Sequence, residues 1–158
     1  MANKEHLEII EKGVVVWNEW RQNNPELKPD LFEADLSRAN LVGANLSKVN
    51  LIKAKLMGAK LYEANLSNAY LNEASLDGAD LCGANLRKAC LNRASLSTAN
   101  LMWADFNGAD LSGSNLEYAI LAKTNFERAN LTGCKNLWNF CLEFGTKGSH
   151  TVRSYNHT

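Results

Sequence analysis

The side chains that could do chemistry are few, and their spacing does not build a catalytic or metal site. Four cysteines lie in the second half of the chain at irregular spacing, without a C-x-x-C motif: Cys82, Cys90, Cys134 and Cys141. Three histidines lie near the two ends: His6, His150 and His157. The long middle part therefore offers neither zinc-ligand spacing nor the histidine of a nucleophilic triad, and it has no glycine-rich phosphate loop. We expect no enzyme activity, no cofactor and no metal site.

Cysteine usage and the absence of membrane signals favour a cytoplasmic protein. The four cysteines are interpreted as reduced thiols that act as small apolar residues, with a Cys134–Cys141 disulfide as the alternative. No run of 18 apolar residues occurs, and the N-terminal sequence MANKEHLEII lacks the pattern of a secretory signal. We therefore expect no contact with a membrane.

The composition points to an internal repeat that would have to position any functional side chain. Leu, Ala and Asn supply 23, 19 and 20 of the 158 residues. From Leu31 to Leu131, every fifth residue is Leu except Phe106 and Phe126. The residue two positions earlier is Ala in most units, and the residue between them is usually Asn, Asp or Ser. The unit A-(N/D)-L-x-x thus runs without interruption from about residue 30 to residue 134.

A period of five fits neither an α-helix nor a flat strand. In a helix the Leu side chains would be spread around every side, and in a strand they would alternate between the two faces. A chain that turns a corner at every unit keeps all Leu and Ala side chains inside. Four such sides, each made of one unit, close a coil, and successive coils stack. The sequence therefore predicts an all-β solenoid.

The units ADLSR (34–38), ANLSK (44–48) and ANLRK (84–88) resemble those of the pentapeptide-repeat protein family. The resemblance implies a right-handed quadrilateral β-helix, here of about five coils, with Leu and Ala at its two inward positions. A helical leader before the repeats is familiar from bacterial, particularly cyanobacterial, members. Other members resemble B-DNA, bind DNA gyrase and modulate quinolone resistance.

Three parts of the chain are expected: an N-terminal α-helical cap (1–29), the repeat β-helix (30–134), and a C-terminal cap with an irregular tail (135–158). In the first part, Asn3 is a candidate helix N-cap, Gly13 permits a bend, and two prolines, Pro25 and Pro29, end the helix. Its apolar side chains recur at helical spacing and are expected to cover the open end of the core: Leu7, Ile10, Val14 and Trp17, broadened by Ile9, Val16 and Trp20.

The C-terminal end of the repeats shows a register shift, because Leu131 is followed by Leu137 after six residues. The aromatic residues Trp138 and Phe140 come immediately afterwards and are candidates for the second cap. A dimer contact through this aromatic end is the alternative.

A coil of four units places each side chain beside its counterpart four units earlier. Phe106 and Phe126 are therefore predicted to stack in the interior, where two rings in adjacent coils share one widened region. Two outward columns are interpreted as structural. One alternates in charge: Glu33, Lys53, Glu73 and Arg93. The other is expected to form hydrogen bonds from coil to coil: Asn45, Asn65, Asn85, Asp105 and Asn125.

A third outward column contains no charge. We call it, together with its neighbours, the apolar strip: Val42, Tyr62, Cys82, Met102 and Ala122, flanked by Trp103, Tyr118 and Ile120. A contiguous apolar surface usually marks an interface. The strip is therefore a candidate surface for a protein partner or a second copy of the chain, unless a terminal segment of the chain covers it.

The charge balance restricts the function further. The chain holds 17 basic and 17 acidic residues, so direct binding of nucleic acid is not expected. The repeat region carries nearly equal numbers of both signs, and Lys53, Lys55 and Lys60 lie close together in sequence. A gyrase-binding mimic of DNA would need an acidic surface, so that role is the alternative. The leading interpretation is a non-catalytic structural or protein-interaction module.

Overall fold

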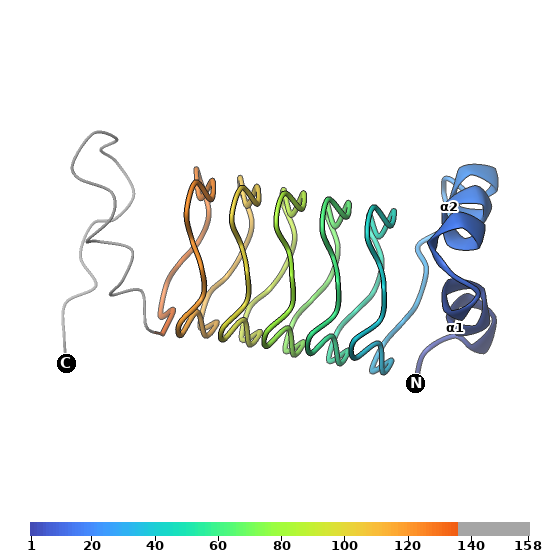
Figure 1. Ribbon diagram of the computed structural model, residues 1–158, viewed down its shortest axis with the longest axis horizontal. Coiled ribbons are helices and arrows are strands. Elements are labelled where there is room, and N and C mark those ends of the chain that lie inside the picture. Colours follow the sequence, from blue (N-terminus) through green and yellow to red (C-terminus); the bar gives the residue numbers. More distant parts are fainter. Residues whose placement is uncertain (136–158) are drawn as a thin grey trace.

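The structure, a computed structural model, describes residues 1–135. Two short helices, α1 (Lys4–Glu11) and α2 (Val14–Asn23), lie at one end of a tower of stacked coils (Figure 1). In the tower, single-residue parallel bridges join each polar residue before Leu to its counterpart four units on, from Asp30↔Asn50 to Asn115↔Lys135. Each coil therefore has four sides of one unit each. Within the described residues, no helix is long and apolar enough to cross a membrane.

In the middle of the tower, a unit with Asn or Asp before Leu pairs all five of its backbone N–H groups. In the unit 64–68, Asn65 donates to the preceding coil (2.9 Å), and Leu66 and Asn68 donate to the following coil (2.7 and 2.9 Å). Ala64 closes a turn on the preceding Leu (3.0 Å). The remaining N–H, of Ser67, donates to Oδ1 of Asn65 at 3.1 Å. A tower with short sides and many corners is stable because no backbone donor of such a unit is left unpaired.

The polar position before Leu therefore acts mainly within its own unit. Its side-chain oxygen accepts the N–H two residues later, as in an Asx turn, at Asn45, Asn85 and Asn125 alike. The predicted bond between coils is present where Asn follows Asp in the column, as from Asn125 Nδ2 to Asp105 Oδ1 (2.8 Å). Among the described residues, the predicted side-chain bond between coils is therefore confirmed at the last step of this column and is absent between its asparagines.

Every unit places its second turn residue in the left-handed region. Seven of these residues in the tower are Gly and fourteen are not, with φ between 53° and 69°. This conformation lets the Ala N–H reach the Leu carbonyl and turns the corner, as in a type II turn. Gly adopts it freely, whereas a side chain such as that of Thr98 (φ 57°) costs about 1–2 kcal/mol.

The core is a column of Leu and Ala side chains along the tower. Nearly all are fully buried, and those of the last coil, such as Ala129 and Leu131, are partly buried. Polar replacements at the Ala position are satisfied internally: Thr124 Oγ1 donates to the Leu101 carbonyl at 2.7 Å, and Ser114 Oγ lies 3.3 Å from Cys134 Sγ. Phe106 is fully buried, and its ring stacks on Phe126 at 5.3 Å between centroids and 18° between planes.

The N-terminal segment forms two helices rather than the single bent helix that the sequence predicted. Gly13, with φ 107°, lies between the two helices and directly precedes α2. Its positive φ ends the first helix instead of bending a continuous one. Asn3 caps α1 by accepting the N–H of His6 at 3.2 Å. Ile10 and Trp17 are buried against the core, and Leu7, Ile9, Val14 and Trp20 are partly buried there. Val16 is 41% exposed, so its assignment to the apolar face was wrong.

Side chains of both helices bind backbone groups at the edge of the first coil. Trp17 Nε1 donates to the Asn45 carbonyl (2.9 Å), and Asn18 Oδ1 accepts the Asn45 N–H (2.8 Å). His6 Nδ1 accepts the N–H of Asp30 at 3.0 Å. In the interior of the tower, the corresponding groups pair with the coil before. Side chains of the helices thus bond backbone groups that, further along the tower, bond the preceding coil.

Arg21 completes these contacts as a buried cation. Its guanidinium donates to the carbonyls of Leu27 and Ser47, both at 2.9 Å, while its Nε has no acceptor among residues 1–135. Burial lowers the pKa of Arg21 from its usual value. This role could not be predicted from the sequence, because an arginine at the end of an amphipathic helix is normally exposed.

Candidate functional site

The apolar strip is continuous along the tower. The carbonyls of Tyr62, Cys82, Met102 and Ala122 each accept an N–H from the coil before, at 2.9 to 3.1 Å. These bonds place the five residues of the column, which begins at Val42, one above another. Trp103 follows Met102 on the same coil. Ile120 lies on the same side of the last coil, two residues before Ala122 and two after Tyr118.

The larger side chains of the strip are open to solvent within the described part of the chain. Exposed fractions reach 54% for Trp103, 70% for Tyr118 and 52% for Ile120, against 41% for Tyr62 and 42% for Val42. Cys82, Met102 and Ala122 are half-buried between their neighbours. The helices α1 and α2 lie on the end of the tower (Figure 1) and do not cover this face.

Charged groups border the strip on one edge. Lys123 Nζ lies 3.9 Å from the centre of the Trp103 ring, a cation–π contact. At the other end, a hydrogen bond with Glu63 and the charge of that carboxylate raise the pKa of Tyr62. Gly43 and Gly83 occupy the same left-handed column as Trp103. The backbone conformation of the turn would favour Gly at residue 103, so it does not explain why a Trp occupies this position.

Within the tower, two exposed apolar side chains outside the strip were missed by the sequence reasoning. Met57 is 45% exposed and Tyr70 is 39% exposed. Met57 lies between Ser37 and Asp77 in its column, so it is isolated rather than part of a patch. Such single side chains are normal on protein surfaces.

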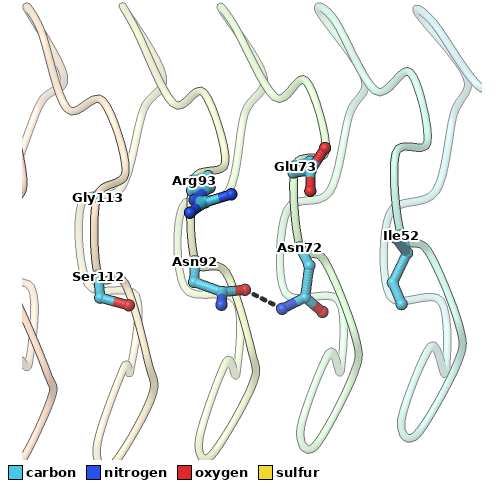
Figure 2. A pocket seen from close by; sticks show the side chains of 7 residues that line it. All are labelled: Ile52, Asn72, Glu73, Asn92, Arg93, Ser112 and Gly113. Carbon is cyan, nitrogen blue, oxygen red and sulfur yellow. Dashed lines mark hydrogen bonds between the residues drawn. The ribbon is translucent and has the colours of Figure 1, made fainter.

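A shallow groove lies on another face of the tower. It is lined by Ile52, Asn72, Glu73, Asn92, Arg93, Ser112 and Gly113 (Figure 2). Glu73 and Arg93, which form one flank of the groove, belong to the outward column of alternating charge predicted from the sequence. In that column Lys53 pairs with Glu73 at 3.8 Å, whereas no ion pair joins Glu33 to Lys53 or Glu73 to Arg93 in the described structure. The expected alternation is therefore only partly realised as contacts.

The remaining predicted residues are placed as follows. Lys55 pairs with Asp35 at 3.8 Å, so the three clustered lysines do not form one basic surface. Cys134 forms no disulfide with another residue among 1–135; its thiol donates to the Leu111 carbonyl at 3.0 Å, and burial raises its pKa. Cys82 and Cys90 are also free, and burial raises the pKa of each thiol. Trp138, Phe140 and Cys141 lie outside the described residues.

No group of ligands suited to a metal ion is present among residues 1–135. In the same range, the tower carries no histidine near a cysteine or serine nucleophile. The chemistry that the described surface offers is contact and hydrogen bonding: an apolar strip on one face and a polar groove on another.

The repeats match the family model for pentapeptide repeats in eight copies, over residues 30–68, 59–97 and 99–135. The chain belongs to the pentapeptide-repeat family. Proteins of this family are known to form right-handed quadrilateral β-helices, which agrees with the four-sided coil described above. No curated protein is significantly similar to the chain.

Several solved structures are similar to this pentapeptide-repeat protein. HetL from the cyanobacterium Nostoc sp. strain PCC 7120, described as involved in heterocyst differentiation regulation, is 39% identical over 68% of this chain and 59% of its own, with a TM-score of 0.38. AT2G44920 from the Arabidopsis thaliana thylakoid lumen is 30% identical over 60% of this chain and 63% of its own (TM-score 0.45).

The plasmid-mediated fluoroquinolone resistance protein QnrB1 is 16% identical over 75% of this chain and 89% of its own (TM-score 0.40). Other similar structures also come from cyanobacteria. The chain spans less than two thirds of the length of the first two proteins. The family assignment rests on the repeats themselves.

Proposed function

We propose that this protein is a non-catalytic interaction module in which the β-helix supports a protein-binding surface, the apolar strip. The observation that carries the proposal is the continuous column of uncharged side chains, with Trp103, Tyr118 and Ile120 more than half exposed at one end. Aromatic side chains supply large contact area at low entropic cost, and exposed contiguous apolar surface favours association. A rigid tower keeps the spacing of these side chains fixed before binding.

The helices α1 and α2 are proposed to be the N-terminal cap of the β-helix. Support comes from the edge contacts of Trp17, Asn18 and Arg21, which occupy backbone groups that would otherwise be open to another chain. A cap at one end directs association away from end-to-end stacking and towards the sides of the tower. At the opposite end, Trp138 and Phe140 stay candidates for the second cap.

A cytoplasmic location and the lack of enzyme activity are parts of the same proposal. The free thiols of Cys82, Cys90 and Cys134 suit a reducing compartment. The gyrase-binding alternative gains no support from the surface, because the chain has equal numbers of acidic and basic residues. Lys53 and Lys55 are moreover paired with carboxylates, so charge is balanced locally as well as in total.

The test is a double substitution in the strip, Met102→Glu with Trp103→Glu. The full-length protein and the variant are used as baits in extract from the source organism, and light scattering measures the mass of each alone. We expect the variant to lose a specific partner, or its self-association, while its circular dichroism and melting temperature stay near those of the parent protein.

The matched control is Met57→Glu with Tyr70→Glu, which charges two exposed apolar residues outside the strip. This control should retain every interaction of the parent protein. Unchanged binding and unchanged mass in the Met102/Trp103 variant would show that the strip is not the binding surface.

A further inference from the structure

The groove on the second face holds several solvent-accessible hydrogen-bond donors that bond no other residue among 1–135. Asn72 Nδ2 donates to Oδ1 of Asn92, so Oδ1 rather than Nδ2 of Asn92 faces Asn72 (Figure 2). Both N–H groups on Asn92 Nδ2 are then left for the groove, and among residues 1–135 they have no acceptor. The hydroxyl of Ser112, one coil further on, and the guanidinium of Arg93 also have no partner in that range.

The gap between these donors has a structural cause. Asn72 and Asn92 are long enough to bridge adjacent coils. At the next step of the column, the shorter side chain of Ser112 ends at Oγ. The chain of side-chain bonds therefore stops at Asn92. Beside it, Gly113 carries no side chain, and a Cβ there would lie 3.6 Å from Cγ of Arg93. The site is open on the side where Arg93 lies.

The charges around the gap select the kind of ligand. Arg93 is unpaired, whereas the neighbouring Glu73 is balanced by Lys53 at 3.8 Å. Asp110 lies two residues before Ser112, and its Oδ1 already accepts the N–H of Ser112 (3.0 Å) and Nδ2 of Asn130 (3.0 Å). Repulsion from the carboxylates of Glu73 and Asp110 increases with the charge of the ligand. A monoanionic carboxylate is therefore favoured over a dianionic phosphate.

We propose that the gap between Asn92 and Ser112 binds a carboxylate, with Arg93 supplying the charge and Asn92 Nδ2 and Ser112 Oγ the other donors. A guanidinium matches the planar carboxylate with two parallel N–H groups. The ligand is either a small carboxylic acid or the acidic side chain of a bound peptide. This site is on a different face from the apolar strip and does not depend on it.

The test is a titration of the full-length, ¹⁵N-labelled protein at constant ionic strength, followed by NMR. The probes are acetate for a free acid, N-acetyl-aspartate N-methylamide for a peptide side chain, and inorganic phosphate for comparison. We expect saturable shifts at the Arg93 Nε–H, the Asn92 side-chain amide and the Gly113 N–H, with a dissociation constant of about 10 mM. The carboxylate probe that binds more tightly identifies the source.

Arg93→Gln should weaken binding about tenfold, and Ser112→Ala about threefold. The matched control is Arg38→Gln. Arg38 occupies the same left-handed turn position beside a glycine, Gly58, with its Cγ 3.7 Å from the place of a Cβ, but its neighbouring column offers Met57 instead of a donor. Linear shifts without saturation, equal effects of Arg38→Gln and Arg93→Gln, or tighter binding of phosphate than of either carboxylate would overturn the proposal.

Discussion

Replacement of Arg21 by Met tests whether the N-terminal helices are fixed by their contacts with the first coil. The guanidinium makes two bonds of 2.9 Å to backbone carbonyls, and each charge-assisted bond contributes about 1.5–3 kcal/mol. Burial of the charge, with Nε left without an acceptor in the described structure, offsets several kcal/mol of that gain. Met retains much of the packing, so the expected net loss is about 2 kcal/mol.

Hydrogen exchange followed by mass spectrometry measures where this loss occurs. The helices α1 and α2 form their hydrogen bonds to the tower at its first coil, so exchange should accelerate about 30-fold in peptides from residues 1–29. Peptides from residues 60–120 should exchange at the parent rate, because their bonds run between coils that the substitution does not touch.

The control is Arg38→Met, the same substitution at an exposed arginine, which should change neither region. A change below threefold in residues 1–29 would mean that Arg21 does not fix the helices. Equal acceleration throughout the tower would mean that the two helices and the β-helix unfold as one unit, which would also refute the reasoning.

Three further outcomes are expected. Thr98→Gly should raise the free energy of unfolding by about 0.5–1 kcal/mol in a urea titration, since relief of the left-handed strain (φ 57°) exceeds the entropic cost of Gly; destabilisation would contradict this. Phe106→Ala should cost about 3–5 kcal/mol and Phe126→Ala clearly less, because only Phe106 is fully buried; equal losses would disagree. Burial alone would raise the pKa of Asp105, but hydrogen bonds from Arg87, Asn107 and Asn125 outweigh it and lower the pKa. Asp105 therefore stabilises the fold above about pH 4, this contribution disappears as the pH falls through the lowered pKa, and Asp105→Asn should flatten that part of an acid-unfolding curve.

The regular part of the tower could be predicted because one rule acts at every unit. A chain that turns a corner at every unit buries both Leu and Ala, and with four sides to a coil Phe106 is placed beside Phe126, as observed. The left-handed turn was not predicted, because two thirds of the residues that adopt it are not Gly and carry no local signal.

The irregular part could not be predicted because its contacts are specific to one place. Arg21, Asn18 and His6 bind backbone atoms of a coil that is distant in sequence, and nothing in a helical pattern indicates which polar side chain will do so. The strip was found because stacking is regular. The groove was not predicted from the sequence, because it depends on the side chain of Ser112 being shorter than that of Asn92 and on Gly113 having no side chain.

The four-sided coil has a consequence for how such surfaces change in evolution. Each outward column collects residues that are four units apart, whereas the inward residues recur in every unit. An insertion of four units would add one more row to the strip and to the groove. An insertion of a single unit between Tyr62 and Met102 would leave the interior intact but rotate every later residue by a quarter turn. Met102 and Trp103 would then leave the face that holds Val42 and Tyr62, so one short duplication would divide the strip between two faces of an otherwise unchanged tower.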